Sequence, residues 1–409
     1  MAFETSKELT LVREWIFMLI CPVDLTRKLV QIETVNPPGN ERRCVALLEK
    51  ILTDAGFVTR RYEFAEGRTS LIATCSGGRG LPICFTGHLD TVPIGSRAWS
   101  VDPFEAEIIG DKLYGRGSSD MKSGVAAFVC AAINLANELR GGPGVVLVLT
   151  ASEETGCQGA QHLASLDGVL GDVGAVVVGE MTANYPLLGH KGALWLDIQT
   201  EGITAHGSTP ENGVNAVYRG AHIVTKLENF GFNVAPHHIL GSASVSVGTF
   251  TGGVTTNTVP DSASVGVDVR TIPGMEHSSI KDSLAQYLGD DVAVVESTVD
   301  LQGVLTNPDN EWVREVFATV RKYHEHELEP KGASYFTDAS VLKNAYPGAP
   351  IIILGPGEPS QAHRTDEYCY ITKIQTATKI YQDLMRNWAE GRTELATSAE
   401  SESIKLNLR

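Results

Sequence analysis

Residues 83–91 read ICFTGHLDT, a short apolar run that ends in a histidine and an aspartate two positions apart. Three other segments are equally short and apolar, namely residues 145–150 (VVLVLT), 175–178 (AVVV) and 351–354 (IIIL). Such runs are typical of strands buried on both faces of a parallel sheet. A helical pattern over residues 121–139 lies between the first two runs, and another over residues 373–387 follows the last. The alternation predicts an α/β fold, a mainly parallel sheet flanked by helices.

A second texture begins near Lys191. Residues 193–200, 242–249 and 262–270 alternate apolar and polar side chains, which is typical of half-solvated antiparallel strands. Helices are expected over 215–230 and 280–288, and a closing strand over 292–299. After about residue 301 the α/β texture returns. We therefore predict a discontinuous domain, residues 1–189 and 301–409, that is interrupted by a smaller α+β domain, residues 190–300.

The composition excludes several classes of protein. The chain has 409 residues, with 33 Lys and Arg against 49 Asp and Glu, a formal net charge of −16. This balance argues against binding to nucleic acid or to an anionic membrane surface. No apolar run reaches the ~18 residues of a membrane span, and residues 15–20 (WIFMLI) are expected to form the buried side of a first helix. The seven scattered cysteines favour reduced thiols and a cytoplasmic location. The polar tail from Gly391 is expected to be poorly ordered.

Polar side chains with metal-ligand chemistry follow the apolar runs. His88 and Asp90 come at the end of the first, where ligands bind in open α/β sheets. Residues two apart on extended backbone face the same way, so Asp90 could hold one ring nitrogen of His88 while the other faces a metal. A histidine and an aspartate in an ordinary turn would look the same.

Acidic residues follow two of the other apolar runs, and one stands at the start of a helix. Residues 114–124 (YGRGSSDMKSG) place Asp120 at a helix start, where it could also be a simple N-cap. Glu153 and Glu154 follow residues 145–150, and Glu180 follows residues 175–178. Adjacent carboxylates at a buried strand end are costly unless a positive charge compensates, although an acidic helix start is the alternative. One of the two could bind metal while the other holds a proton.

His363, in residues 362–368 (AHRTDEY), completes a set of two imidazoles and several carboxylates. Mixed nitrogen and oxygen ligands suit zinc or a similar first-row dication. Five ligands are too many for one tetrahedral zinc, but they fit two metals that share a carboxylate. We therefore expect two divalent metal ions, Zn²⁺ first, with Co²⁺ or Mn²⁺ as alternatives.

The segments GHLDTVP, YGRGSSDMKSG, ASEETG, VGEM and AHRTDEY, in this order, resemble the zinc-dependent family of acetylornithine deacetylase, succinyl-diaminopimelate desuccinylase, aminoacylase-1 and glutamate carboxypeptidase. The resemblance spans positions 87–368. It implies that His88 and Glu180 bind one metal, that Glu154 and His363 bind the other, and that Asp120 bridges both. It further implies that Glu153 is the general base, that Asp90 orients His88, and that the peptide bond after Asp120 is often cis.

The inserted domain also matches, as a lid and dimerisation domain. The resemblance implies that His206, in residues 202–210 (GITAHGSTP), stabilises the oxyanion from its own or the partner subunit of a homodimer. A surface histidine beside a turn is the alternative. Asn257 and Arg270 resemble contacts to a substrate carboxylate, and Arg270 suits a bidentate pair with such a group. A surface ion pair is its alternative role.

The expected function is hydrolysis of the amide bond of an N-acyl amino acid by a di-metal-activated water, with a glutamate as base. A dipeptidase or glutamate-type carboxypeptidase on the same scaffold is the alternative, and a ligand-binding relative without turnover is a third. The chain departs from the desuccinylases and deacetylases in having Met181 and Thr182 after the glutamate of VGE, where those enzymes usually have Pro-Thr. The acyl group and side chain of the substrate are therefore left open.

Overall fold

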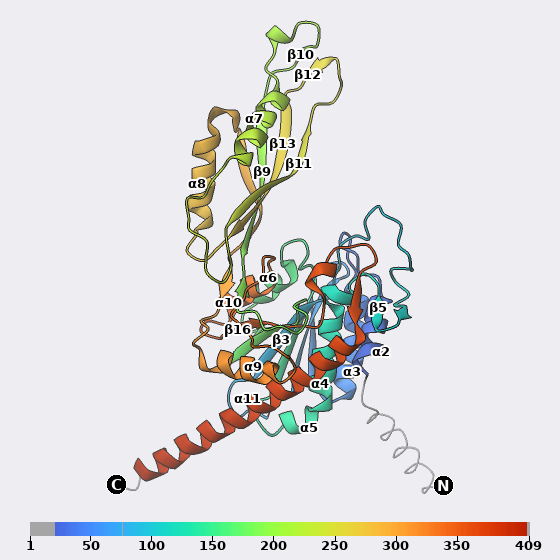
Figure 1. Cartoon of the computed structure of the whole chain (residues 1–409), viewed down its shortest axis with the longest axis vertical. Coiled ribbons are helices and arrows are strands. Elements are labelled where there is room, and N and C mark those ends of the chain that lie inside the picture. Colours follow the sequence, from blue (N-terminus) through green and yellow to red (C-terminus); the bar gives the residue numbers. More distant parts are fainter. Residues whose placement is uncertain (1–20, 76, 407–409) are drawn as a thin grey trace. The chain divides into compact units, whose positions relative to one another are not determined.

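The computed structural model describes residues 21–75 and 77–406 of the chain. Residues 15–20, expected to form a first helix, lie outside this range. The chain folds into two compact units (Figure 1). The first takes in the described residues up to Leu188, then Thr306–Glu329 and the residues from Thr337 onward. The second comprises Gly189–Leu305 and Pro330–Phe336.

The first unit contains a six-stranded sheet with the spatial order β1–β2–β6–β3–β7–β16. The strands are β1 (Val58–Ala65), β2 (Arg68–Cys75), β6 (Val145–Thr150), β3 (Ile83–His88), β7 (Ala175–Val178) and β16 (Ile351–Ile353). Strands β6, β3, β7 and β16 are parallel to one another, while β2 is antiparallel to β6 and β1 to β2. The predicted α/β fold with a mainly parallel sheet is confirmed.

The four parallel strands are buried along their whole length, as their apolar sequences predict. In the register of β3 and β6, Ile83 pairs with Val145 and His88 pairs with Thr150. The carboxyl ends of these strands are therefore level with each other. The residues that follow them emerge at one edge of the sheet.

Helices pack against this sheet and against one another. They are α2 (Pro22–Val30), α3 (Arg42–Asp54), α4 (Ser123–Asn134), α5 (Ala136–Leu139), α6 (Gln158–Ser165), α9 (Glu311–Arg321), α10 (Ala339–Ala345) and α11 (Ile371–Leu406). α4 contacts β3, β6 and α11, whereas α3 and α6 contact β1 and β2. The helix expected over 121–139 is divided at Leu135, whose backbone leaves the helical region (φ −103°, ψ 5°).

α11 continues past Gly391 to Leu406, and the expectation of a poorly ordered tail stays a prediction. The segment 391–406 contains no proline, which would interrupt a helix. None of the helices within the described residues is long and apolar enough to cross a membrane.

All seven cysteines are free thiols, and six of them are buried.

A small three-stranded sheet lies beside the loop that precedes α4. It has the order β17–β5–β4 and consists of β17 (Tyr368–Tyr370), β5 (Lys112–Tyr114) and β4 (Ile108–Ile109). Two short helical segments flank it in sequence, η1 (Ser118–Lys122) and η4 (Pro359–Gln361). Tyr368 pairs with Tyr114, so two segments that are far apart in the chain lie side by side.

The second unit is built on an antiparallel sheet with the order β11–β13–β9–β14. Its main elements are β9 (Gly192–Glu201), α7 (Ala216–Glu228), β11 (Ser244–Gly252), β13 (Ser262–Thr271), α8 (His277–Leu288) and β14 (Val294–Leu301). Shorter elements are β8 (Gly189–His190), β10 (Ala205–His206), η2 (Pro210–Asn212), β12 (Thr258–Val259), η3 (Gly289–Asp291) and β15 (Val304–Leu305). The predicted α+β character is confirmed.

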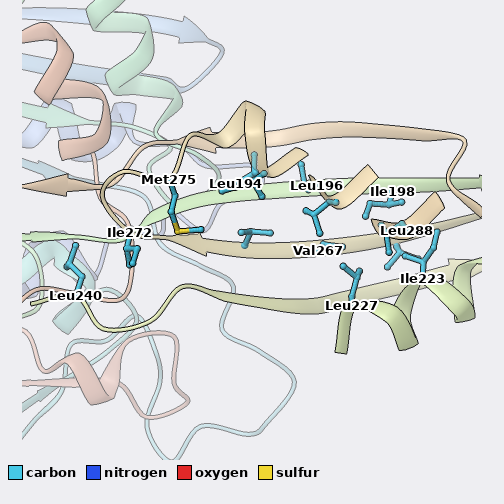
Figure 2. Close-up of a cluster of buried hydrophobic side chains, with 14 residues drawn as sticks. Leu194, Leu196, Ile198, Ile223, Leu227, Leu240, Val267, Ile272, Met275 and Leu288 are labelled. Atoms are coloured by element: carbon cyan, nitrogen blue, oxygen red, sulfur yellow. The ribbon is translucent and has the colours of Figure 1, made fainter. Parts of the chain in front are cut away.

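Alternation along the strands builds the core of the second unit (Figure 2). Every second residue of β9, including Leu194, Leu196 and Ile198, is buried. Ile223 of α7 and Leu288 of α8 pack onto the same cluster. One face of the sheet is thus covered by helices, which is the arrangement that the period-two pattern indicates.

Candidate metal centre

His88, the last residue of β3, is 1% exposed. Its Nδ1 atom lies 3.0 Å from the backbone carbonyl oxygen of Asp90 and 3.5 Å from Asp90 Oδ1. Its Nε2 atom lies 3.1 Å from Asp120 Oδ1 and 3.6 Å from Glu180 Oε1. The ring is therefore oriented by its own loop on one side and faces two carboxylates on the other.

Asp120 lies in η1, immediately before α4, and its peptide bond to Met121 is cis. Its Oδ1 atom faces His88, while its Oδ2 atom lies 3.3 Å from His363 Nε2. The residue that precedes α4 is Lys122, so Asp120 is not the N-cap of that helix. Each oxygen of one carboxylate faces a different imidazole, which is how a carboxylate shared by two cations would be placed.

Glu154 and His363 lie together on the side of Asp120 that its Oδ2 atom faces. His363 Nε2 lies 3.1 Å from Glu154 Oε2. His363 follows η4 with a left-handed backbone (φ 61°), and its side chain is 56% exposed. The Glu154 side chain is only 7% exposed.

These side chains form two groups that could each hold a metal ion. One contains His88, Asp120 and Glu180, and the other contains Asp120, Glu154 and His363. In each group one nitrogen or oxygen atom per residue lies within 4.8 Å of the others. Glu154 Oε1 and Glu180 Oε2 are buried without a hydrogen-bond partner among the described residues. Buried carboxylate oxygens of this kind are costly unless a cation compensates, so the residues fit a pair of divalent metal ions.

The charges in the centre are strongly coupled. Burial raises the pKa of Glu180 well above its ordinary value. The Asp120 carboxylate raises this pKa further, and His88 lowers it. Burial would lower the pKa of His88, but Glu180 and Asp120 raise it well above its usual range. Hydrogen bonds to Asp120 and Glu154 raise the pKa of His363 to about 10. The carboxylates thus favour a positive charge, from a protonated imidazole or a metal ion, beside each of the two oxygens of Asp120.

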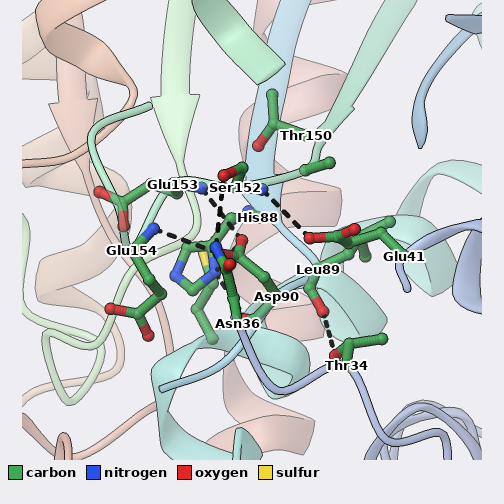
Figure 3. Close-up of polar contacts among 12 residues, drawn as sticks. Thr34, Asn36, Glu41, His88, Leu89, Asp90, Thr150, Ser152, Glu153 and Glu154 are labelled. Atoms are coloured by element: carbon green, nitrogen blue, oxygen red, sulfur yellow. Dashed lines mark hydrogen bonds and ion pairs between the residues drawn. The ribbon is translucent and has the colours of Figure 1, made fainter. Parts of the chain in front are cut away.

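Asp90 connects the histidine to both glutamates of the next strand end (Figure 3). Its Oδ1 atom accepts a hydrogen bond from the backbone N–H of Glu153 at 3.0 Å, and its Oδ2 atom accepts one from Glu154 at 3.3 Å. Burial raises the pKa of Asp90, but the His88 ring outweighs it and the pKa is lowered. Asp90 is therefore an ionised group that fixes the backbone of residues 153 and 154.

Asn36 was missed by the sequence analysis as a site residue. Its side-chain amide donates to Asp90 Oδ2 at 2.9 Å, and its Oδ1 atom accepts from Arg68 Nη1 at 3.2 Å. Arg68 in turn forms a buried ion pair with Glu41 at 2.8 Å. Asn36 precedes two cis prolines in a segment that reads only as a turn signal. The sequence carries no sign that this turn meets Asp90, 54 residues away.

Glu153 is 5% exposed, and among the described residues its carboxylate belongs to neither metal-binding group. Its Oε1 atom lies 4.0 Å from the Cys157 thiol. Burial raises the pKa of Glu153 well above its ordinary value. The nearby Glu180 and Glu154 carboxylates raise this pKa further, and His88 lowers it. Because burial favours the neutral form, this carboxyl group holds a proton more readily than an exposed glutamate does.

The other predicted site residues belong to the second unit. His206 lies in β10 and is exposed. Its Nδ1 atom accepts a hydrogen bond from Ser208 N at 3.1 Å and lies 2.7 Å from Ser208 Oγ. Asn257 precedes β12, and its carbonyl oxygen accepts from Gly207 N at 2.7 Å. Arg270 pairs with Asp268 at 2.9 Å, and its buried Nη1 atom has no hydrogen-bond partner within the described residues.

The comparisons with known proteins cover nearly the whole chain. The chain is 28% identical over 401 residues to a probable succinyl-diaminopimelate desuccinylase of Staphylococcus epidermidis, covering 90% of this chain and 98% of that one. It is 25% identical over 378 residues to an acetylornithine deacetylase of Buchnera aphidicola, with coverages of 90% and 97%.

Among solved structures, the M20 family metallo-carboxypeptidase Sso-CP2 of Sulfolobus solfataricus matches with a TM-score of 0.76 and 16% identity, covering 89% of this chain and 98% of that one. The model of peptidase family M20/M25/M40 matches residues 84–387. That range includes all five predicted metal ligands, and it confirms the resemblance seen in the sequence. The chain belongs to peptidase family M20/M25/M40, a family of hydrolases.

Proposed function

We propose that this chain hydrolyses the amide bond of an N-acyl amino acid with the help of two divalent metal ions. The observation that carries the proposal is the position of Asp120, whose two oxygens face the two imidazoles. His88 and Glu180 would hold one ion, Glu154 and His363 the other, and Asp120 both. Bound at these residues, the ions would lower the pKa of a water molecule and polarise the substrate carbonyl.

Glu153 would take the proton from the attacking water and return it to the leaving amine. Its burial and raised pKa support both steps, because a carboxylate with a raised pKa is a stronger base toward the water. Asp90 supports this role by fixing the Glu153 backbone and by orienting His88. The base is thus held by the same carboxylate that orients a metal ligand.

Three residues of the second unit complete the proposal. His206 would donate a hydrogen bond to the oxyanion, from its own chain or from the partner in a homodimer. Arg270 has a buried guanidinium nitrogen without a hydrogen-bond partner among the described residues, which suits a substrate carboxylate. Asn257 would contact the same group. We further propose that residues 190–300 act as the lid and dimerisation domain and that the enzyme works in the cytoplasm.

The acyl amino acid is favoured over a peptide because the two curated relatives named above are a desuccinylase and a deacetylase, each matched over nine-tenths of this chain. The solved structure named above is a carboxypeptidase, but at 16% identity it shows only the fold. Peptidase activity is therefore the second candidate.

A substrate panel on zinc-loaded protein tests the proposal. Acetyl-, succinyl- and peptidyl-amino acids are assayed side by side, with chelated and cobalt- or manganese-reloaded protein as controls. We expect turnover of an N-acyl amino acid, loss of activity on chelation and its recovery on reloading. Preferred turnover of the peptides would favour the peptidase alternative, and binding without product release would indicate a non-catalytic relative.

The variant Glu153→Gln tests the assignment of the base. It keeps the size of the side chain but cannot accept the proton, so kcat should fall by about 10²–10⁴-fold. The metal content should stay that of the unmodified chain, because Glu153 is not among the proposed ligands. Full activity of the variant would reject the assignment.

A further inference from the structure

The amides of loop 117–120, which carries Asp120, converge on one buried carboxylate. Glu367 Oε1 accepts hydrogen bonds from Ser119 N at 2.8 Å and from Asp120 N at 3.0 Å. Glu367 Oε2 accepts a third from Gly117 N at 3.0 Å. The side chain of Glu367 is fully buried, and its two oxygens hold three of the four amide groups of the loop.

Arg116 forms a buried ion pair with this carboxylate. Its Nη1 atom lies 2.5 Å from Glu367 Oε2, and its side chain is only 1% exposed. Its Nη2 atom donates to the carbonyl oxygen of Pro93 at 3.1 Å, and its guanidinium lies 5.3 Å from the centre of the Trp99 ring. A buried carboxylate is tolerated when it is paired and its lone pairs are occupied, as they are here.

Glu367 also connects the two ends of the metal centre along the chain. It stands four residues after His363 and directly before β17, which pairs with β5. Its carbonyl oxygen accepts from Gly115 N at 2.9 Å, and Ser119 Oγ donates to the carbonyl oxygen of Tyr368 at 2.7 Å. The segment that carries His363 is thus hydrogen-bonded to the loop that carries Asp120, the ligand shared by both ions.

We propose that Glu367 is a positioning residue that sets the Asp120 carboxylate between the two metal ions. It acts through the amides of loop 117–120, with Arg116 orienting its carboxylate. This inference rests on the proposed two-metal function. A hydrogen bond to the amide of Asp120 itself fixes the point from which that side chain starts. A shift of this loop would change the distances of 3.1 Å and 3.3 Å from Asp120 to the two imidazoles.

The variant Glu367→Gln tests the inference. The glutamine amide group would meet an N–H or guanidinium donor where the carboxylate accepts, so the loop must move. We expect zinc affinity, measured by competition with a chromophoric chelator, to fall by about 10–100-fold, the usual effect of losing a residue that orients ligands. The absorption spectrum of the Co²⁺-loaded variant should change as well, because the geometry at Asp120 changes.

Thermal unfolding separates positioning from a purely structural role. If Glu367 only stabilised the fold, Tm would fall equally with and without zinc, and affinity and spectrum would match the unmodified chain. That result would overturn the inference. If Glu367 positions Asp120, the rise in Tm on adding zinc should shrink, because stabilisation by a ligand depends on its affinity.

Two further variants complete the test. Glu138→Gln is the matched control, since it breaks the ion pair of Glu138 with Arg386 in the same unit and should leave zinc affinity unchanged. If Glu367→Gln does not fold, Arg116→Lys is tested in its place. The single ammonium group of lysine cannot bind both the Glu367 carboxylate and the Pro93 carbonyl oxygen. Unchanged zinc affinity in this variant would also overturn the inference. A failure of the unmodified chain to bind zinc would instead contradict the proposed function.

Discussion

The two halves of the metal centre are built differently. His88 is the last residue of β3, and Glu180 follows β7, the neighbouring parallel strand. Their side chains are 1% and 3% exposed. Glu154 and His363 stand in loops, and the His363 side chain is 56% exposed. Segments with few buried contacts open more easily than core strands. We therefore expect the half with His88 to hold its metal ion more tightly than the half with His363.

Asp120→Asn should have the largest effect because it removes the negative charge shared by both halves. Asparagine keeps the size of the side chain but offers only one acceptor oxygen. Affinity at both positions should fall by more than the roughly 100-fold typical of an outer residue. Metal analysis after gel filtration checks this, and a variant that retained two zinc ions per chain would remove Asp120 from the shared position.

Replacing each histidine separately sharpens the comparison. His363→Ala should leave one tightly bound zinc ion, because the ligands of the buried half are intact. His88→Ala should lose the tighter site and retain only weak binding. Calorimetric titration of the two variants with Zn²⁺ measures the difference, and equal affinities in the two would show that burial does not distinguish the halves.

The exposed half should also respond to pH. The pKa of His363 is raised to about 10 by Asp120 and Glu154, so a proton competes with the metal ion for Nε2. Zinc affinity at this half should rise as the pH rises from 6 to 9, with one proton released per ion bound. Titrations in buffers of different ionisation enthalpy measure the release, and His363→Ala should remove the part of the pH dependence that comes from this imidazole.

The same shift has a consequence for the stability of chelator-treated protein. The folded pKa of His363 lies above the ordinary histidine value of 6.5, so its stabilising contribution is complete below about pH 6.5 and is lost as the pH rises through about 10. Urea unfolding at a series of pH values should show this loss. His363→Ala, in which it should be absent, is the control.

Asn36→Ala should have the smallest effect, because Asn36 touches no predicted metal ligand directly. It leaves Asp90 with one hydrogen bond fewer and a buried guanidinium nitrogen of Arg68 without its partner. Urea unfolding should show a loss of about 1–3 kcal/mol, the usual cost of such an unpaired group. Thr53→Ala, which removes an exposed hydroxyl contact with Thr59, is the control and should change the free energy of unfolding far less.

The sequence predicts the parallel core strands well because burial on both faces leaves a visible apolar run. It does not predict β1, an edge strand whose exposed positions include Arg60 and Arg61 and hide the pattern. The same contrast holds for the site. His88 and Glu180 stand at strand ends, whereas the partners Asn36 and Glu367 act through contacts 54 and about 250 residues apart, which no local pattern records.

The central claim is that one carboxylate is shared by two metal ions. A crystal structure of the zinc-soaked protein, with anomalous scattering measured at the zinc edge, tests it most directly. We predict two anomalous peaks, one on each side of Asp120, the first beside His88 and Glu180 and the second beside Glu154 and His363. A single peak, or peaks that do not contact Asp120, would contradict the account.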